Sequence, residues 1–155
     1  MWVFDTTLYQ IYPLGMLGCP FDAPALGDDG AIQRERGLHR VRSLIEWAPY
    51  LEELGVGTIL LNPVFSSDTH GYNTRNLREI DCRLGTNEDF ANVVDALHAR
   101  GVRVIVDAVF NHVGRNFWAF RRVGQNGPMR RAVAVRRSAH SDCVCCPRGR
   151  VGWSA

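Results

Sequence analysis

The amino-acid sequence predicts an α/β fold with parallel strands, because strand-like and helix-like segments alternate along the chain. Residues 102–106 are β-branched except for Arg103, which is typical of a strand buried on both faces of a parallel sheet. Residues 55–63 contain a second apolar run, and an apolar period of 3.6 residues marks residues 43–54 and 86–101 as helices. Strand, helix, strand, helix and strand then form two right-handed crossover units.

Each predicted helix has an apolar face and an end signal. Over residues 43–54 the apolar residues are Leu44, Ile45, Ala48, Leu51 and Leu54. Gly55 ends this helix, and Gly101 ends the next one. The second helix begins with Thr86 and Asp89, which are spaced as in a capping box. Residues 18–38 precede the first helix, are rich in Gly, Pro and charged residues, and are expected to form a long, partly disordered loop.

Polar side chains follow the two apolar runs. Asp107, Asn111 and His112 come after residues 102–106, and His70 and Tyr72 come after residues 55–63. Ligand-binding groups gather at the carboxyl ends of strands in α/β barrels. A tyrosine after a glycine suits the C–H face of a sugar. The alternatives are a turn-capping Asp107, a rim histidine with ordinary hydrogen bonds, and a tyrosine that is simply buried.

The pattern leaves the architecture open between a barrel and a doubly wound sheet. A complete eight-stranded barrel takes about 200 to 250 residues. This chain has 155 residues, with three strands recognisable in the sequence. If the three strands belong to a barrel, one face of their sheet lacks a partner layer, and we expect poor solubility.

Five ordered motifs resemble the start of the catalytic barrel of the alpha-amylase family, the family 13 glycoside hydrolases. Residues 8–13 (LYQIYP) look like its first strand, and residues 51–63 like the end of its first helix and its second strand. Residues 70–72 (HGY) resemble its substrate loop, residues 84–90 (LGTNEDF) the entry to its second helix, and residues 107–112 (DAVFNH) the conserved region at its third strand. The resemblance covers about residues 8 to 120 and implies the N-terminal portion of a (β/α)8 barrel.

The resemblance also implies roles for single residues. Tyr72 would stack on the sugar on the non-reducing side of the cleaved bond, and His112 would hydrogen-bond that sugar. Asp107 would support the site by holding an arginine on the fourth strand, and His70 would support it from the substrate loop. Asn111 resembles a position that ligates structural calcium in many relatives, so calcium is the one cofactor implied. Asn73 stands where the family commonly has aspartate.

The implied activity is hydrolysis or transfer of α-glucosidic linkages, with an α-glucan or maltooligosaccharide as partner. Retaining cleavage needs a carboxylate nucleophile and a carboxylic acid about 5 to 5.5 Å apart. In the family these groups come from the fourth and fifth strands, so no catalytic residue is assigned here and the chain alone is expected to be inactive. The alternative is a noncatalytic protein that binds sugar with this half-site or a polyanion with its basic tail.

The composition changes near residue 120. Residues 1–120 hold 10 arginines and 15 acidic residues, whereas residues 121–155 hold eight arginines and one acidic residue, Asp142. The later segment has no sustained apolar period and is expected to be disordered. The sequence therefore predicts a partial barrel over residues 1–120 and an Arg- and Cys-rich tail over residues 121–155. A reading-frame change near Arg121 would explain the shift.

The remaining composition is that of a chain outside the membrane class and predicts a cytoplasmic location. No apolar run reaches 18 residues, so no membrane partner is expected, and the N-terminus lacks the pattern of a secretory signal. The five cysteines are odd in number and form no disulfide framework, which fits a reducing compartment. The arginine pairs of the tail lack interleaved aromatic residues, so no specific nucleic-acid partner is expected.

Overall fold

The computed structural model describes residues 5–126, and its centre is a parallel three-stranded sheet. The strands are β1 (Leu8–Ile11), β2 (Thr58–Leu61) and β5 (Arg103–Val106), in the order β1-β2-β5. Ile11 pairs with Leu61, and Leu61 pairs with Val106. The predicted parallel sheet and its three strands are therefore confirmed.

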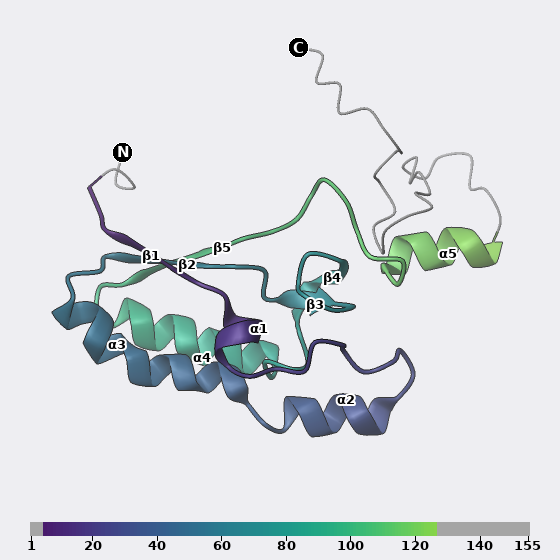
Figure 1. Ribbon diagram of the computed structural model, residues 1–155, viewed down its shortest axis with the longest axis horizontal. Helices are drawn as coiled ribbons and strands as arrows, with labels where there is room; N and C mark the ends of the chain where they lie inside the picture. Colours follow the sequence, from purple (N-terminus) through teal and green to yellow (C-terminus); the bar gives the residue numbers. More distant parts are fainter. Residues whose placement is uncertain (1–4, 127–155) are drawn as a thin grey trace, which may run out of the picture.

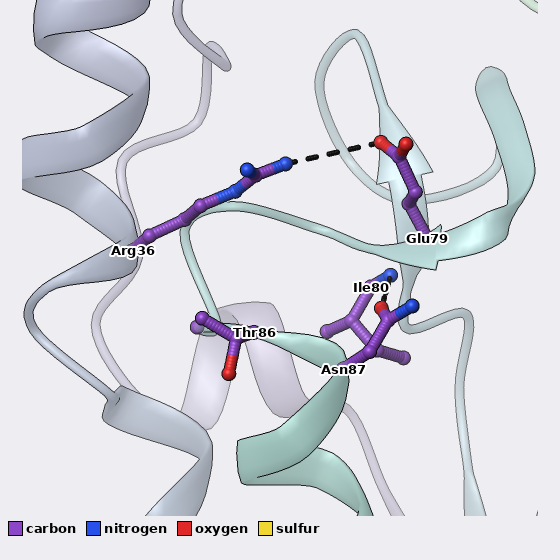
Figure 2. Close-up of a pocket in the computed structure, with 6 residues that line it drawn as sticks. Arg36, Glu79, Ile80, Thr86 and Asn87 are labelled. Atoms are coloured by element: carbon purple, nitrogen blue, oxygen red, sulfur yellow. Dashed lines mark hydrogen bonds and ion pairs between the residues drawn. The ribbon is translucent and has the colours of Figure 1, made fainter.

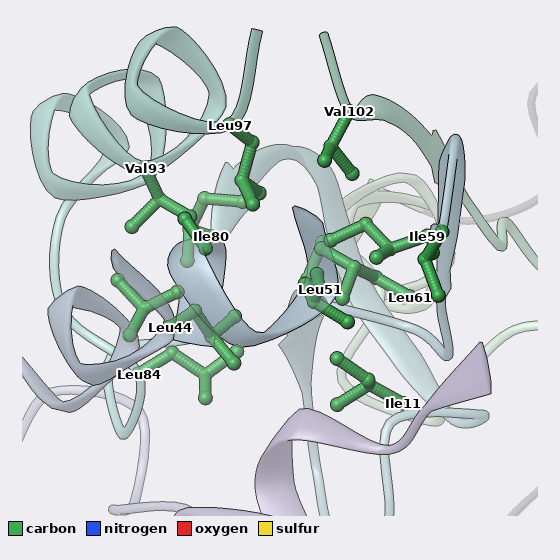
Figure 3. Packing of buried hydrophobic residues seen from close by; sticks show 14 of the residues in the cluster. Ile11, Leu44, Leu51, Ile59, Leu61, Ile80, Leu84, Val93, Leu97 and Val102 are labelled. Carbon is green, nitrogen blue, oxygen red and sulfur yellow. The ribbon is translucent and has the colours of Figure 1, made fainter. Parts of the chain in front are cut away.

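Two helices cover one face of this sheet, as Figure 1 shows. They are α3 (Leu44–Glu53) and α4 (Asn87–His98), and both were predicted from their apolar period. Their apolar faces meet the strands in one core, drawn in Figure 3, whose fully buried members include Leu44, Leu51, Ile59, Leu61, Val93 and Leu97. Burial of these side chains provides the main driving force for the fold.

The opposite face of the sheet is more open. Leu8 and Gln10 alternate with residues that pack on the helices, so they lie on this face. Leu8 is 43% exposed, and Gln10 pairs with the partly exposed Leu60. A strand residue that faces the interior of a complete barrel becomes exposed in this way when the other strands of the barrel are absent.

The start of α4 is fixed by a buried carboxylate. Thr86 and Asp89 form the predicted capping box, with the Thr86 hydroxyl accepting from the Asp89 backbone. Asp89 is fully buried and also binds His39 and Arg42. It thereby ties α4 to the 3-10 helix η2 (Arg40–Ser43). Burial alone raises the pKa of Asp89, but its hydrogen bonds outweigh that effect and hold the pKa well below its usual range.

Two parts of the structure differ from the sequence prediction of loops. Residues 18–38 contain helix α2 (Asp29–Arg36), whose N-cap Asp28 accepts from Ala31 N at 2.9 Å. The loop prediction was wrong there because no residue of α2 is buried, so the helix has no apolar stripe to reveal it. Between β2 and α4 lies an antiparallel hairpin that the sequence did not predict, formed by β3 (Phe65–Ser67) and β4 (Thr74–Ile80).

Two further helices complete the described chain. A short helix, α1 (Pro13–Met16), follows β1, and α5 (Trp118–Asn126) follows the loop after β5. Residues 121–126 belong to α5, so the expected disorder does not hold for them, whereas residues 127–155 lie outside the described residues. No helix within residues 5–126 has both the length and the apolar character needed to cross a membrane.

Candidate functional site

The carboxyl edge of the sheet brings two polar residues side by side. Asn62 follows β2, and its backbone N–H donates to the carbonyl of Ile11 at 2.8 Å. Asp107 follows β5, and its backbone N–H donates to the carbonyl of Leu61, also at 2.8 Å. The parallel pairing thus continues one residue past each strand, which places Asn62 and Asp107 on a rigid edge.

Tyr72 is held at this edge by a chain of hydrogen bonds. The Asn62 side-chain amide donates to the Tyr72 hydroxyl oxygen at 2.6 Å. The Gln10 amide in turn donates to the Asn62 side-chain oxygen at 2.7 Å. Tyr72 is half-buried, so part of its ring remains available to a ligand. Asn62 and Gln10 were not singled out from the sequence, although an asparagine at the end of a buried strand is a signal of a rim residue.

Gly71 lets the backbone before Tyr72 pass close to the end of β2. Its φ is +94°, and an added Cβ would lie 3.1 Å from the carbonyl oxygen of Pro63 and 3.4 Å from Leu14 Cδ1. A side chain would meet both backbone strain and a close contact. This geometry bears out the prediction that the glycine allows a close backbone approach.

His70 lies on the exposed side of the same loop. Its Nδ1 accepts from the Tyr72 backbone N–H at 3.2 Å, and its carbonyl accepts from the Tyr12 hydroxyl at 3.2 Å. The rings of His70 and Tyr72 are 5.9 Å apart, centre to centre. His70 therefore contacts Tyr72 directly, while its supporting role remains a prediction.

The hairpin turn that carries His70 and Tyr72 is braced from within. Asn73 is buried, donates to Thr69 Oγ1 at 2.9 Å and accepts from the Thr69 backbone at 3.0 Å. An asparagine side chain provides both the donor and the acceptor that this turn uses. Asp68 binds Arg75 Nε at 2.6 Å and Asn116 Nδ2 at 2.8 Å, which joins the turn to the segment after β5.

His112 lies in that segment after β5. Two residues later, Gly114 N donates to Thr74 O at 2.9 Å, so the loop returns to the hairpin that bears Tyr72. The Nδ1 atom of His112 is buried, and within the described part of the chain it has no hydrogen-bond partner. Leaving such an atom unpaired costs about 1–3 kcal/mol.

Asn111 is the position that the family resemblance relates to a calcium ligand, and that role stays a prediction. Calcium takes about six to eight oxygen ligands. Asn111 is exposed, and within residues 5–126 no three His, Cys, Asp or Glu side chains converge as a metal site would require. No chemical step is assigned to the metal.

A hollow at the start of α4 is lined by residues that contact one another (Figure 2). It is lined by Arg36, Glu79, Ile80, Gly85, Thr86 and Asn87. Arg36 forms an ion pair with Glu79 at 3.8 Å, and Asn87 Oδ1 accepts from Ile80 N at 2.8 Å. These contacts connect α2, β4 and α4, and they use the polar groups that a ligand would need.

The fold and the edge residues fit part of an α/β-barrel domain, with aromatic and polar groups at the carboxyl ends of parallel strands. The family model described as the alpha-amylase catalytic domain matches residues 35–142. The chain belongs to the alpha-amylase family of glycoside hydrolases, and it corresponds to the N-terminal part of the family's barrel. The match runs past residue 120, where the sequence predicts a boundary, and that boundary remains a prediction.

Similar proteins support the same assignment. Neopullulanase 2 from Thermoactinomyces vulgaris is 37% identical over 138 residues, covering 84% of this chain and 23% of that protein. Intracellular maltogenic amylase from Bacillus subtilis is 34% identical over 136 residues, covering 84% of this chain and 23% of that protein. The cyclic alpha-maltosyl-(1→6)-maltose hydrolase of Arthrobacter globiformis, in complex with cyclic alpha-maltosyl-(1→6)-maltose, matches with a TM-score of 0.66 and 28% identity, covering 90% of this chain and 34% of that chain. The chain thus spans less than a quarter of the length of the two curated relatives.

Proposed function

We propose that the residues at the carboxyl edge of the sheet form part of the glucose-binding site of an enzyme. This enzyme hydrolyses or transfers α-glucosidic linkages in maltooligosaccharides or a related α-glucan. The observation that carries the proposal is the placement of Tyr72, half-buried at the carboxyl edge and hydrogen-bonded by Asn62 at 2.6 Å. The names of the similar proteins, which refer to maltogenic and maltosyl-cleaving enzymes, support the substrate class.

The proposal gives each edge residue a distinct task. Tyr72 offers its ring to the C–H face of a glucosyl unit, and the Asn62 hydrogen bond fixes the direction of that ring. His112 supplies an imidazole whose buried Nδ1 has no partner among the described residues. Asp107 orients a neighbouring arginine, and His70 supports the Tyr72 loop. The described residues bind and orient sugar in this scheme, and the reacting carboxylates come from elsewhere in the enzyme.

The 155-residue chain by itself is proposed to have no turnover. A retaining mechanism requires two carboxyl groups about 5 to 5.5 Å apart across the scissile bond. Asp107 is at the edge and could provide one carboxyl group. Asp68 and Asp81 are not free to provide the second, because both form ion pairs with arginines, at 2.6 and 2.8 Å. A noncatalytic sugar-binding role is the second candidate, because the aromatic part of the site is present in this chain without such a pair at its described edge.

We further infer that the protein works in the cytoplasm. Cys19 and Cys82 are free thiols in the structure, and the name of the Bacillus subtilis relative describes an intracellular protein. Free half-buried thiols suit a reducing compartment. Cell fractionation followed by immunodetection tests this inference, and recovery of the protein from the culture medium contradicts it.

Titration calorimetry with maltotriose and with β-linked cellotriose tests the sugar site. The wild-type chain should bind maltotriose, and Tyr72→Ala should weaken that binding about tenfold or more, because the aromatic contact with the sugar is lost. Tyr50→Ala is the matched control, since Tyr50 is exposed on α3, away from the edge. Equal affinity for the two trisaccharides, or no effect of Tyr72→Ala, would contradict the proposal. Hydrolysis of maltotriose by the purified chain would contradict only the proposed lack of turnover.

A further inference from the structure

An acidic residue joins the loop that carries His112 to the hairpin that carries Tyr72. Asp68 directly follows β3, and its Oδ1 accepts from Arg75 Nε at 2.6 Å and from Asn116 Nδ2 at 2.8 Å. Arg75 belongs to β4 of the same hairpin, whereas Asn116 belongs to the segment between β5 and α5. Figure 1 shows that segment passing the hairpin on its way to α5. Asp68 therefore connects the two loops on which the proposed sugar contacts lie.

Two buried arginines fix the hairpin side of this connection. Arg83 is fully buried, and it donates to the carbonyl of Thr69 through Nη2 and to the carbonyl of Phe21 through Nη1, both at 2.6 Å. Arg75 is 8% exposed and donates through Nη1 to the carbonyl of Pro24 at 2.8 Å. The turn of the hairpin is therefore tied at two points to the loop after β1.

The segment after β5 packs directly against this fixed hairpin. A Cβ added at Gly114 would lie 2.5 Å from Asp68 Oδ2 and 2.6 Å from the carbonyl oxygen of Asn73, so any side chain there would push the two segments apart. Asn73 directly follows Tyr72 in the sequence, and Gly114 lies two residues after His112. A displacement at this contact would therefore change the position of His112 relative to Tyr72.

The hydrogen bond from Asn116 is the part of the connection that can be removed alone. The side chains of Asp68 and Arg75 are only 14% and 9% exposed, and charged hydrogen bonds such as theirs are stronger than neutral ones. This ion pair fixes the carboxylate that accepts from Asn116. Asn116 itself is exposed, so truncation of its side chain leaves both the ion pair and the core intact.

We propose that Asp68 is a positioning residue that acts through Asn116. It holds the loop after β5 at a fixed distance from the hairpin, so that His112 and Tyr72 contact the same glucosyl unit. This proposal rests on the proposed function and adds to it the residue that sets the relative position of two sugar contacts. Asp68 itself does not touch the sugar in this scheme. Asn116 should therefore contribute to sugar binding only by way of His112.

A double-mutant cycle on the full 155-residue chain tests this coupling, with maltotriose affinity measured by titration calorimetry. Asn116→Ala should weaken binding about threefold, and His112→Phe about tenfold. The double variant should bind about tenfold more weakly than wild type, and not about thirtyfold, because Asn116 has no group left to position. Asn116→Gln keeps the amide donor and should recover part of the affinity. Asn92→Ala, at an exposed position on α4, is the matched control and should bind as wild type does.

A second measurement separates positioning from stability. In NMR spectra of chain with labelled histidines, Asn116→Ala should shift the ring resonances of His112. The ring resonances of His98, which is exposed at the end of α4, should stay unchanged. The thermal midpoint of Asn116→Ala should equal that of wild type, because the truncated side chain is exposed.

The outcomes separate this proposal from the proposed function. If Tyr72→Ala weakens maltotriose binding while Asn116→Ala binds as wild type does, the coupling is overturned and the proposed function stands. A loss of about thirtyfold in the double variant also overturns the coupling, because Asn116 and His112 then act independently. A lowered thermal midpoint in Asn116→Ala with unchanged His112 resonances would show a purely structural role and overturn it as well. If the wild-type chain does not bind maltotriose, both proposals fail.

Discussion

Asn62 and Tyr72 are joined by a hydrogen bond of 2.6 Å that connects the end of a buried strand to a tyrosine on the neighbouring loop. Tyr72 therefore takes its orientation from the sheet. We expect Asn62→Ala to weaken maltotriose binding about fivefold, because a typical hydrogen bond contributes about 1 kcal/mol. Asn62→Asp should recover part of the affinity, since a carboxylate can accept from the Tyr72 hydroxyl. Calorimetry measures both, and equal affinities in the two variants would exclude the orienting role.

Replacing His112 should affect protein stability and sugar affinity differently. Its buried Nδ1 lacks a partner among the described residues, so His112→Phe removes a group that costs free energy in the unliganded fold. We expect the free energy of unfolding to stay unchanged or to rise by up to about 1 kcal/mol. Sugar affinity should fall in the same variant. Urea unfolding and titration of one sample measure the two effects, and a large loss of stability would show that the ring has a structural role instead.

Gly71→Ala should be more harmful than the same change at Gly18. Both glycines have positive φ, +94° and +62°, so both substitutions incur backbone strain of about 1–2 kcal/mol. An added Cβ at Gly71 also meets Pro63 O at 3.1 Å, whereas the space at Gly18 is open. We expect Gly71→Ala to lose about 1 kcal/mol more than Gly18→Ala in urea unfolding. Equal losses would mean that the loop moves away from Pro63 at no cost.

Asp89 should make stability depend on pH. Its pKa is lowered in the folded state, so it contributes stability above its unfolded pKa of about 3.9, and this contribution is lost as the pH falls below that value. Asp89→Asn should cost about 3 kcal/mol at pH 7, because His39 and Arg42 lose a buried carboxylate. The difference in free energy of unfolding between wild type and variant should shrink as the pH falls toward 2. Asp22→Asn, at an exposed position, is the control and should show no such difference.

Local signals accounted for the parts of the fold that the sequence predicted. The Thr86–Asp89 capping box and the apolar stripe of α4 lie within a few residues of each other, so they can be recognised without any tertiary contact. Helix α2 has an N-cap at Asp28 but no buried face. Its sequence therefore lacks the apolar period from which a helix is predicted. The β3–β4 hairpin has irregular register between Phe65 and Ser67, which hides the alternation expected of strands.

The candidate site could be predicted only in part. Tyr72 and His112 stood out because polar residues follow apolar runs, and the structure places both in loops at the carboxyl side of the sheet. The hydrogen bond from Gln10 to Asn62 joins residues 52 positions apart, and it depends on the register of two strands. Arg83 was missed for a similar reason, since a charged residue in a loop gives no sign that it will be fully buried.

The contacts of Arg83 also bear on the order of folding. Its hydrogen bonds to Pro20 and Phe21 close chain loops of 63 and 62 residues, whereas α3 and α4 depend on short-range signals. Long loop closures carry a larger entropy cost and tend to form after local structure. We therefore expect the helices to form early. The loops that Arg83 joins should reach their final arrangement only in the last stage of folding.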